Sequence, residues 1–461
     1  MTRPKTTLFL LGGGGDLSSR LLLPALGQLL TVQPDRQVTL VGVGVDEMTD
    51  ATWRDVVSAS FGTVDASGPA IEALLRDTVF RTADVTSPAA LTELLDDAEG
   101  TPALYFALPP AVTVKACAAL EQVPLPAGTV LALEKPFGTN ADSATALNAQ
   151  LAKLVPENQI HRVDHFLGRS TVFNLLGLRF SNRILEPLWN SEHIESIDII
   201  YDEQLGLEGR AGYYDRAGAL VDMIQSHLLQ VMALVAMEPP STLDAADLRD
   251  AKGLVLRATR PWGDAPTTSG RRARYTAGTV DGRNYPSYVD EKGVTPSNST
   301  ETLAEVTLQV NTWRWAGVPF TLRSGKALGK RRREIVITFK SAKWVPTGFT
   351  GGAEPTVLRL FLAPDKMSLS LNINGAGDPH DLERVTFDAE FSPGQFDAYG
   401  EVLEGILDND PSLSVRGDTA EQSWRIVEPI LQAWREGLTP LEDYPAGSTG
   451  PKNWSPVGIV D

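Results

Sequence analysis

Cysteine is nearly absent from the 461-residue chain, which contains only Cys117. A single cysteine excludes an intrachain disulfide and argues against a thiolate metal cluster. Disulfides persist in oxidising compartments, so this usage is typical of a protein of the reducing cytoplasm. We therefore expect a cytoplasmic protein without a metal centre.

The chain also has fewer basic than acidic side chains. The chain has 41 lysines and arginines against 58 aspartates and glutamates, a formal net charge of −17. Non-specific binding to nucleic acid or to an anionic membrane needs basic surface, so neither partner is expected. An anionic small-molecule substrate would have to be met by a local basic pocket.

Long apolar runs, internal repeats and low-complexity linkers are missing as well. The apolar run in TTLFLLGGGG has about five residues before the glycines, fewer than the ~7–15 of a signal peptide or the ~20 of a membrane span. The length of 461 residues suffices for two or three domains, and 42% apolar content is ordinary for a globular protein.

The first part of the chain alternates short apolar strands with helical stretches. Apolar runs at 38–45, 102–110 and 129–138 follow the one that precedes the glycines. This alternation indicates βαβ units and a parallel sheet buried on both faces. We predict a Rossmann-like α/β dinucleotide-binding domain over residues 1–165.

After residue 165 the strands have few helices between them, and a long helix at 218–237 precedes most of them. This pattern predicts a second domain, 166–461, of the α+β class with a large, mostly antiparallel sheet. Its expected strands are 194–203, 302–310, 333–341, 356–364 and 367–375.

Four consecutive glycines, Gly12 to Gly15, follow the first strand and open a helix at Asp16 and Leu17. Glycines at this place let backbone N–H groups approach a pyrophosphate at the helix N-terminus. Several registers of a dinucleotide fingerprint fit the run, so a flexible turn is the alternative. EKPFG places Glu134 and Lys135 at the end of a buried strand, where open α/β sheets bind ligands.

Two of the five histidines lie in the nine residues HRVDHFLGR at 161–169, together with an aspartate and two arginines. RVDHFLGR is close to the R-I-D-H-Y-L-G-K signature of the glucose-6-phosphate dehydrogenase family, which this chain resembles over nearly its whole length. The motifs that carry the resemblance, in order and at family spacing, are GGGGDL, ALPP, EKPFG, RVDHFLGR, EGRAGYYD, DMIQSHLLQ, WRWAGVPF and RSGKAL.

The resemblance implies oxidation of C1 of glucose 6-phosphate to 6-phosphoglucono-lactone. It implies that His227 is the base for the C1 hydroxyl proton and that Asp164 orients this imidazole and stabilises its protonated form. His165 and Arg169 would bind the phosphate. The full set of implied substrate-binding residues is Lys135, His165, Arg169, Glu203, Asp222, Lys326 and Arg331.

The implied nicotinamide cofactor is NAD, with NADP possible. Val45 stands where the family has an arginine for the 2′-phosphate of NADP, and Asp46 follows it. A carboxylate there can accept a hydrogen bond from the ribose of NAD. Arg20 or Arg54 could fold back and restore NADP binding. The implied cofactor residues are Gly12, Gly15, Asp16, Leu17, Asp46, Pro109 and Lys135.

Three departures from the family fall on the phosphate pocket: Phe166 replaces a tyrosine, Arg169 a lysine and Ala363 a glutamine. Another C6-anionic glucose, such as sulfoquinovose, is therefore the alternative substrate. Two other classes stay open: a catalytically silent nucleotide-binding paralogue with a regulatory role, and an unrelated Rossmann-type oxidoreductase. By resemblance, a homodimer or homotetramer is expected.

Overall fold

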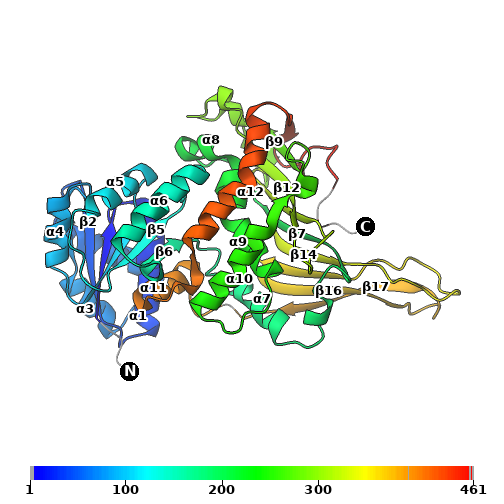
Figure 1. The fold of residues 1–461 in the computed structure, drawn as a ribbon, viewed down its shortest axis with the longest axis horizontal. Coiled ribbons are helices and arrows are strands. Elements are labelled where there is room, and N and C mark those ends of the chain that lie inside the picture. Colours follow the sequence, from blue (N-terminus) through cyan, green and yellow to red (C-terminus); the bar gives the residue numbers. More distant parts are fainter. Residues whose placement is uncertain (1–4, 393, 456–457, 459–461) are drawn as a thin grey trace. The chain divides into compact units, whose positions relative to one another are not determined.

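The structure is a computed structural model that describes residues 5–392, 394–455 and 458. It forms two compact units, each discontinuous in sequence (Figure 1). Unit 1 comprises Met1–Arg169, Pro240–Asp250 and Gly394–Glu421, and unit 2 comprises the rest. We predicted one boundary, after residue 165. In the structure the first boundary follows Arg169, and two later segments of the chain belong to unit 1 as well.

Unit 1 is built on a seven-stranded sheet in the order β18-β6-β5-β4-β1-β2-β3. All its strands are parallel except β18, which pairs antiparallel with β6. The predicted Rossmann-like α/β domain is therefore confirmed. The strands are β1 (Thr6–Leu11), β2 (Val38–Gly44), β3 (Val79–Thr82), β4 (Thr101–Phe106), β5 (Val130–Glu134), β6 (Ile160–Val163) and β18 (Ser414–Val415).

Helices follow each parallel strand up to β5, and proline stands at the start of several of them, where its missing N–H costs no hydrogen bond. They are a π-helical turn (Ser18–Leu22), α1 (Leu23–Val32), α2 (Asp50–Gly62), α3 (Pro69–Asp77), α4 (Pro88–Asp96), α5 (Pro110–Leu120), α6 (Ala141–Leu154) and, from the returning segment, α11 (Ala398–Asp408).

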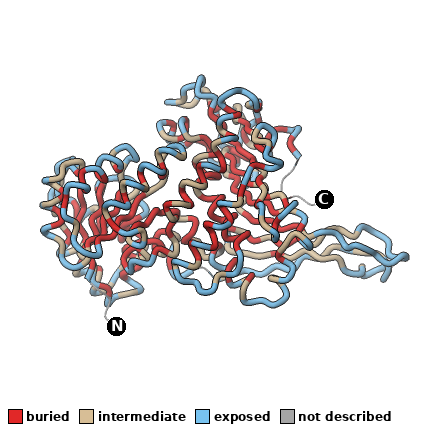
Figure 2. Tube along the Cα trace, in the orientation of Figure 1, coloured by how far each residue is buried: buried red, intermediate tan, exposed pale blue. Residues whose placement is uncertain are grey.

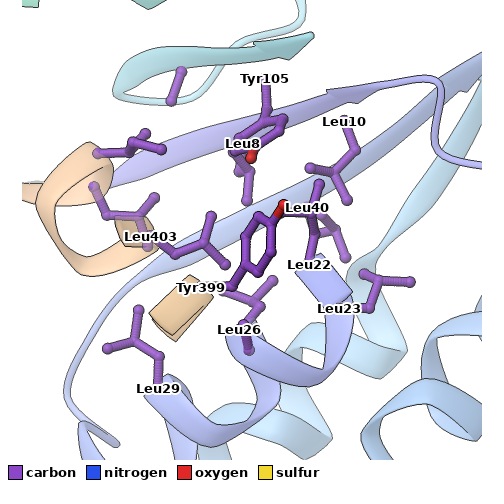
Figure 3. Close-up of a cluster of buried hydrophobic side chains, with 14 of the residues drawn as sticks. Leu8, Leu10, Leu22, Leu23, Leu26, Leu29, Leu40, Tyr105, Tyr399 and Leu403 are labelled. Carbon is purple, nitrogen blue, oxygen red and sulfur yellow. The ribbon is translucent and has the colours of Figure 1, made fainter. Parts of the chain in front are cut away.

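Helix α11 completes the hydrophobic core of unit 1. Leu403, which is fully buried, packs in one cluster with Leu22, Leu26 and Leu29 of the first helix (Figure 3). Tyr105 of β4 and Tyr399 of α11 lie in the same cluster. Unit 1 thus depends on residues from the N-terminal part of the chain and from the segment that returns near its C-terminus.

Unit 2 contains a ten-stranded sheet whose main order is β17-β16-β15-β14-β7-β13-β12-β9-β19, with β8 beside β12. Most pairs are antiparallel, as predicted, and β7/β13 and β9/β19 are parallel. The strands are β7 (Ile194–Asp202), β8 (Thr259–Pro261), β9 (Gly270–Thr276), β12 (Leu303–Val310), β13 (Phe320–Gly325), β14 (Arg332–Phe339), β15 (Val357–Leu362), β16 (Asp365–Asn374), β17 (Leu382–Glu390) and β19 (Leu441–Pro445).

Five strands of this sheet were not among the predicted strands: β8, β9, β13, β17 and β19. In β17, LERVTFDAE, most side chains are exposed (Figure 2), although apolar and polar residues alternate from Val385 to Glu390. The other elements are the strands β10 (Gly278–Val280) and β11 (Arg283–Tyr285) and the helices α7 (Ser170–Phe180), α10 (Ala245–Ala258) and α12 (Gly417–Arg435).

The predicted helix at 218–237 is present. It comprises a π-helical segment (Leu220–Leu228) and α9 (Leu229–Ala236), and α8 (Ala211–Ala219) leads into it across an interruption at Gly218. Among the described residues this is the one helix long and apolar enough to cross a membrane, and 89% of the relevant window is buried inside the protein. Such burial is typical of the core helix of a globular unit.

Candidate active site

The glycine loop is wedged between the ends of β2 and β4. The N–H groups of Gly12 and Gly13 both donate to the carbonyl of Val43, at 2.8 and 2.9 Å. Gly12 has φ +95°, and a Cβ there would lie 2.3 Å from the carbonyl oxygen of Ala107. Only glycine fits this position. The strand order reverses between β1 and β4, so the loop lies at the topological switch point, where such sheets bind ligands.

The helix after the loop is tied back to it. The Ser18 hydroxyl donates to the carbonyl of Gly12 at 3.0 Å, while Gly14, Gly15 and Asp16 are exposed. This leaves the start of the helix open to solvent, with no Cβ on its glycines. Backbone N–H groups in such a turn suit an anion such as a pyrophosphate.

The other predicted cofactor residues lie at the same edge of the sheet. Val45 and Asp46 directly follow β2 and are exposed, Val45 by 70%. Pro109 caps α5 after β4, and Lys135 follows β5. Because parallel strands end at one edge, unit 1 gathers all of them around the glycine loop.

Arg20 and Arg54 are the candidate partners for a 2′-phosphate of NADP. Arg20 is exposed on the first helix. The Nε of Arg54 donates to the backbone carbonyl of Thr78 at 3.1 Å, which holds this side chain against the start of β3.

The carboxyl of Glu134, a half-buried residue, lies at the end of β5. The hydroxyl of Tyr105 donates to its Oε1 at 2.5 Å, and Tyr399 also hydrogen-bonds to it. Burial raises the pKa of Glu134 to about 7, although the two tyrosines and the charge of Lys135 oppose this shift. The charge of Asp164 adds to it. Unit 1 therefore holds a carboxyl that titrates near neutral pH next to two predicted site residues.

The RVDHFLGR stretch makes a turn after β6. Asp164 is 2% exposed, and its Oδ1 accepts the N–H of Phe166 at 3.0 Å. The ring of His165 stacks on that of Tyr399, with centroids 5.2 Å apart and planes 14° apart. The guanidinium of Arg169 lies 4.9 Å from the centroid of the Phe166 ring. Phenylalanine thus lacks the family's hydroxyl but supports the arginine by a cation–π contact.

The other histidine of HRVDHFLGR, His161, is a core residue. His161 is 1% exposed, and its Nδ1 lies 3.1 Å from the hydroxyl of Ser414 in β18. Burial lowers the pKa of His161 to about 4, so the imidazole is neutral at physiological pH.

In unit 2, Asp222 and His227 lie on the π-helical segment and are 7% and 1% exposed. The N–H of Leu229 bonds to the carbonyl of Ile224, an i→i+5 bond. In an α-helix, residues five apart are rotated by about 140°. In a π-helix, whose hydrogen bonds join residues five apart, residue i+5 lies much closer around the axis to residue i, so the segment places carboxylate and imidazole on one face. Apolar spacing alone does not reveal this winding.

A second cluster in unit 2 joins Glu203 to two cations. Nζ of Lys326 lies 2.8 Å from one carboxylate oxygen of Glu203, and Arg333 lies 3.2 Å from the other. Lys326 also lies over the ring of Tyr214, 5.2 Å from its centroid. Arg331, the predicted cation, is exposed just before β14. Arg333 was missed, although the two-residue period of a strand places it on the same side as Arg331.

In the described part of the chain, no three His, Cys, Asp or Glu side chains are grouped so as to hold a metal ion. The lone Cys117 is buried, and burial raises the pKa of its thiol to about 12. This thiol is therefore protonated and unreactive at neutral pH.

A parallel sheet with a glycine loop at its switch point, in one chain with a buried imidazole and carboxylates, defines a Rossmann-type, nicotinamide-dependent oxidoreductase. Residues 9–174 match the NAD binding domain of glucose-6-phosphate dehydrogenase, and residues 176–457 match its C-terminal domain. The chain belongs to the glucose-6-phosphate dehydrogenase family. This membership excludes the unrelated oxidoreductase class.

Relatives and solved structures match over nearly the full length. The glucose-6-phosphate 1-dehydrogenases of Gluconobacter oxydans and Zymomonas mobilis are 41% and 36% identical, covering 96% and 98% of this chain and 93% and 97% of their own. The crystal structure of glucose-6-phosphate 1-dehydrogenase from Mycobacterium avium has a TM-score of 0.84 at 31% identity, covering 98% of this chain and 96% of that one. A glucose-6-phosphate dehydrogenase in complex with its substrate glucose-6-phosphate scores 0.87 at 28% identity, covering 98% and 97%.

Proposed function

We propose that this enzyme oxidises C1 of glucose 6-phosphate to 6-phosphoglucono-lactone. The observation that carries the proposal is the placement of Asp222 and His227 on one face of a buried π-helical turn. An imidazole there takes the C1 hydroxyl proton, while the carboxylate holds a neighbouring sugar hydroxyl. The nicotinamide, when bound, accepts the hydride.

The remaining site residues bind the sugar and the cofactor or orient the imidazole of His227. Asp164 orients the imidazole of His227 and stabilises its protonated form. Lys135 follows β5 at the carboxyl edge of the sheet and bridges sugar and cofactor. Glu203 holds sugar hydroxyls, and its ion pair with Lys326 fixes both side chains.

A matrix of rates tests the function. NAD and NADP are each assayed with glucose, glucose 6-phosphate and sulfoquinovose, and we expect the highest kcat/KM with glucose 6-phosphate. A sulfonate is the second candidate because Phe166 and Ala363 remove two polar side chains that the family places at the phosphate. Oxidation of none of the sugars would instead support the silent paralogue.

We expect Arg169→Ala and His165→Ala to act mainly on the charged sugar. Each removes a charge-assisted contact to the C6 anion, worth about 1.5–3 kcal/mol or roughly 10- to 150-fold in kcat/KM. Activity on uncharged glucose is the internal control and should fall much less. Equal losses on both sugars would mean that these residues do not recognise the anion.

We further propose that NAD is preferred over NADP. The 2′-phosphate of NADP needs a cation after β2, where the chain instead exposes Val45 and Asp46. The side chain of Arg54 is already bonded to the carbonyl of Thr78. Asp46 is suited to accept a hydrogen bond from the ribose 2′-OH of NAD.

The double variant Val45→Arg/Asp46→Ser tests this preference. We expect the ratio of kcat/KM for NADP to that for NAD to rise by about tenfold or more, since a charge-assisted contact contributes ~1.5–3 kcal/mol. Arg54→Gln is the control and should leave the wild-type ratio unchanged. A wild-type enzyme that favours NADP, or a double variant that gains nothing with NADP, contradicts the proposal.

We propose a homodimer or homotetramer formed through the large sheet of unit 2. The support is β17, which among the described strands pairs with β16 alone and ends the sheet. Its Phe387 is 58% exposed. Unpaired strand edges are surfaces on which proteins associate. Analytical ultracentrifugation gives the assembly state directly.

Cytoplasmic localisation stays a prediction.

A further inference from the structure

The helix that carries Asp222 and His227 is interrupted at Gly218. This glycine has φ +66° and ψ 177°, which end α8 and start a new helical segment. A Cβ at position 218 would lie 2.2 Å from Oε1 of Glu301. The carboxylate of Glu301 therefore fills the space beside the interruption.

Glu301 binds the beginning of the new segment. Its Oε1 accepts the N–H of Leu220 at 3.0 Å, and its backbone carbonyl accepts the N–H of Ala219 at 3.3 Å. The first N–H groups of a helix have no acceptor within the helix, and negative charge is favoured there. Glu301 is 6% exposed, and although burial raises its pKa to about 7, the bond from Leu220 opposes that shift.

The next residue, Thr302, connects the same segment, which leads into β12, to the cluster of Glu203 and Lys326. The carbonyl of Thr302 accepts the N–H of Lys326 at 2.9 Å. The hydroxyl of Tyr444 lies 2.9 Å from the Thr302 hydroxyl and 2.7 Å from the carbonyl of Lys326. Two consecutive residues thus hold the start of the π-helical segment and the backbone of the lysine that pairs with Glu203.

We propose that Glu301 is a positioning residue that acts through His227. Its carboxylate fixes where the π-helical segment begins, and this sets the side on which Asp222 and His227 emerge. A shift of the start by one residue would rotate both side chains by about 100° in a helix of ordinary winding. The inference rests on the proposed role of His227 as base and adds a residue that touches neither sugar nor cofactor.

Kinetics of three variants test the contact. Glu301→Ala should lower kcat by about 10- to 100-fold, since a displacement of ~1 Å at a reacting group can cost 10²-fold. Glu301→Gln keeps an oxygen acceptor for the N–H of Leu220 and should stay within about threefold of the wild-type kcat. Glu305→Ala removes an equally buried carboxylate that pairs with Arg271 and Arg323, and kcat per folded enzyme should not change.

A double variant separates positioning from a loss of folded enzyme. Adding Glu301→Ala to His227→Ala should cost no further kcat, because there is no imidazole left to position. A structural defect would instead lower kcat by the same factor in both backgrounds, and that result would overturn the proposal. So would a Glu301→Ala enzyme within twofold of the wild-type kcat.

If Glu301→Ala does not fold, Glu301→Asp replaces it, because the side chain shortened by one methylene retracts from Leu220, and the same results are required. If His227→Ala alone keeps near-wild-type kcat, the proposed base is refuted and this inference with it. That failure is visible in the single variant, before Glu301 is changed.

Discussion

Replacing His227 by alanine should lower kcat by two to four orders of magnitude while KM changes little. A general base contributes ~10²–10⁴-fold because it removes the proton as the C–H bond breaks. His227 is 1% exposed on a helix of the core, so no water-filled surface surrounds it to replace the imidazole. The residue does not bind the C6 anion, and ground-state affinity should therefore persist.

Steady-state rates at saturating sugar and cofactor measure this effect. His193→Ala is the matched control, because His193 is exposed and its backbone makes bonds that alanine keeps: its N–H donates to the carbonyl of Asn190, and its carbonyl accepts the N–H of Lys340. Its kcat should equal that of the wild type. A His227→Ala enzyme that keeps more than about a tenth of the wild-type kcat would remove His227 from the role of base.

Asp164→Asn should also lower kcat strongly, by on the order of 10²–10⁴-fold. An asparagine cannot stabilise an imidazolium and favours the wrong imidazole tautomer, which in another dyad costs ~10⁴-fold. The oxygen Oδ1 of Asp164 accepts the N–H of Phe166, and the amide oxygen of asparagine can accept it equally well. The shape of the turn should therefore survive, and the loss reports the missing charge.

Thermal melting and kcat are measured together for this variant. Asp378→Asn is its control, since Asp378 makes the same i→i+2 bond, to the N–H of His380, in the exposed loop between β16 and β17. Both variants should melt close to the wild type, and only Asp164→Asn should be slow. An Asp164→Asn enzyme with more than about a tenth of wild-type kcat contradicts the orienting role.

The nucleotide-binding half was predictable because its signals are local. A parallel sheet buried on both faces needs continuous apolar runs. Strands β2 and β5 lie within the ranges expected for them, and β4 begins one residue before its range. The glycine loop was predictable for a similar reason, because only glycine fits where Gly12 meets the carbonyl of Ala107. In both cases neighbouring residues in the sequence meet the structural requirement, so the sequence pattern reveals it.

The features that were not predicted depend on partners far apart in sequence or on a helical winding that apolar spacing does not reveal. Tyr399 reaches Glu134 only because α11 returns to unit 1, and no local pattern records that return. The π-helical turn has the same apolar composition as an α-helix, so its winding is set by tertiary contacts such as Glu301. Arg333 was missed because the family resemblance pointed two residues earlier, to Arg331.

The return of Gly394–Glu421 to unit 1 also governs how the chain is made. A nascent chain that has reached Arg169 contains the six parallel strands but lacks α11, so Leu22, Leu26 and Leu29 have no Leu403 to cover them. At roughly 5–20 residues per second, the ribosome needs on the order of tens of seconds to supply the missing helix. Unit 1 is thus the first to leave the ribosome and the last to complete its core, and transiently exposed apolar surface of this kind makes folding intermediates prone to aggregation.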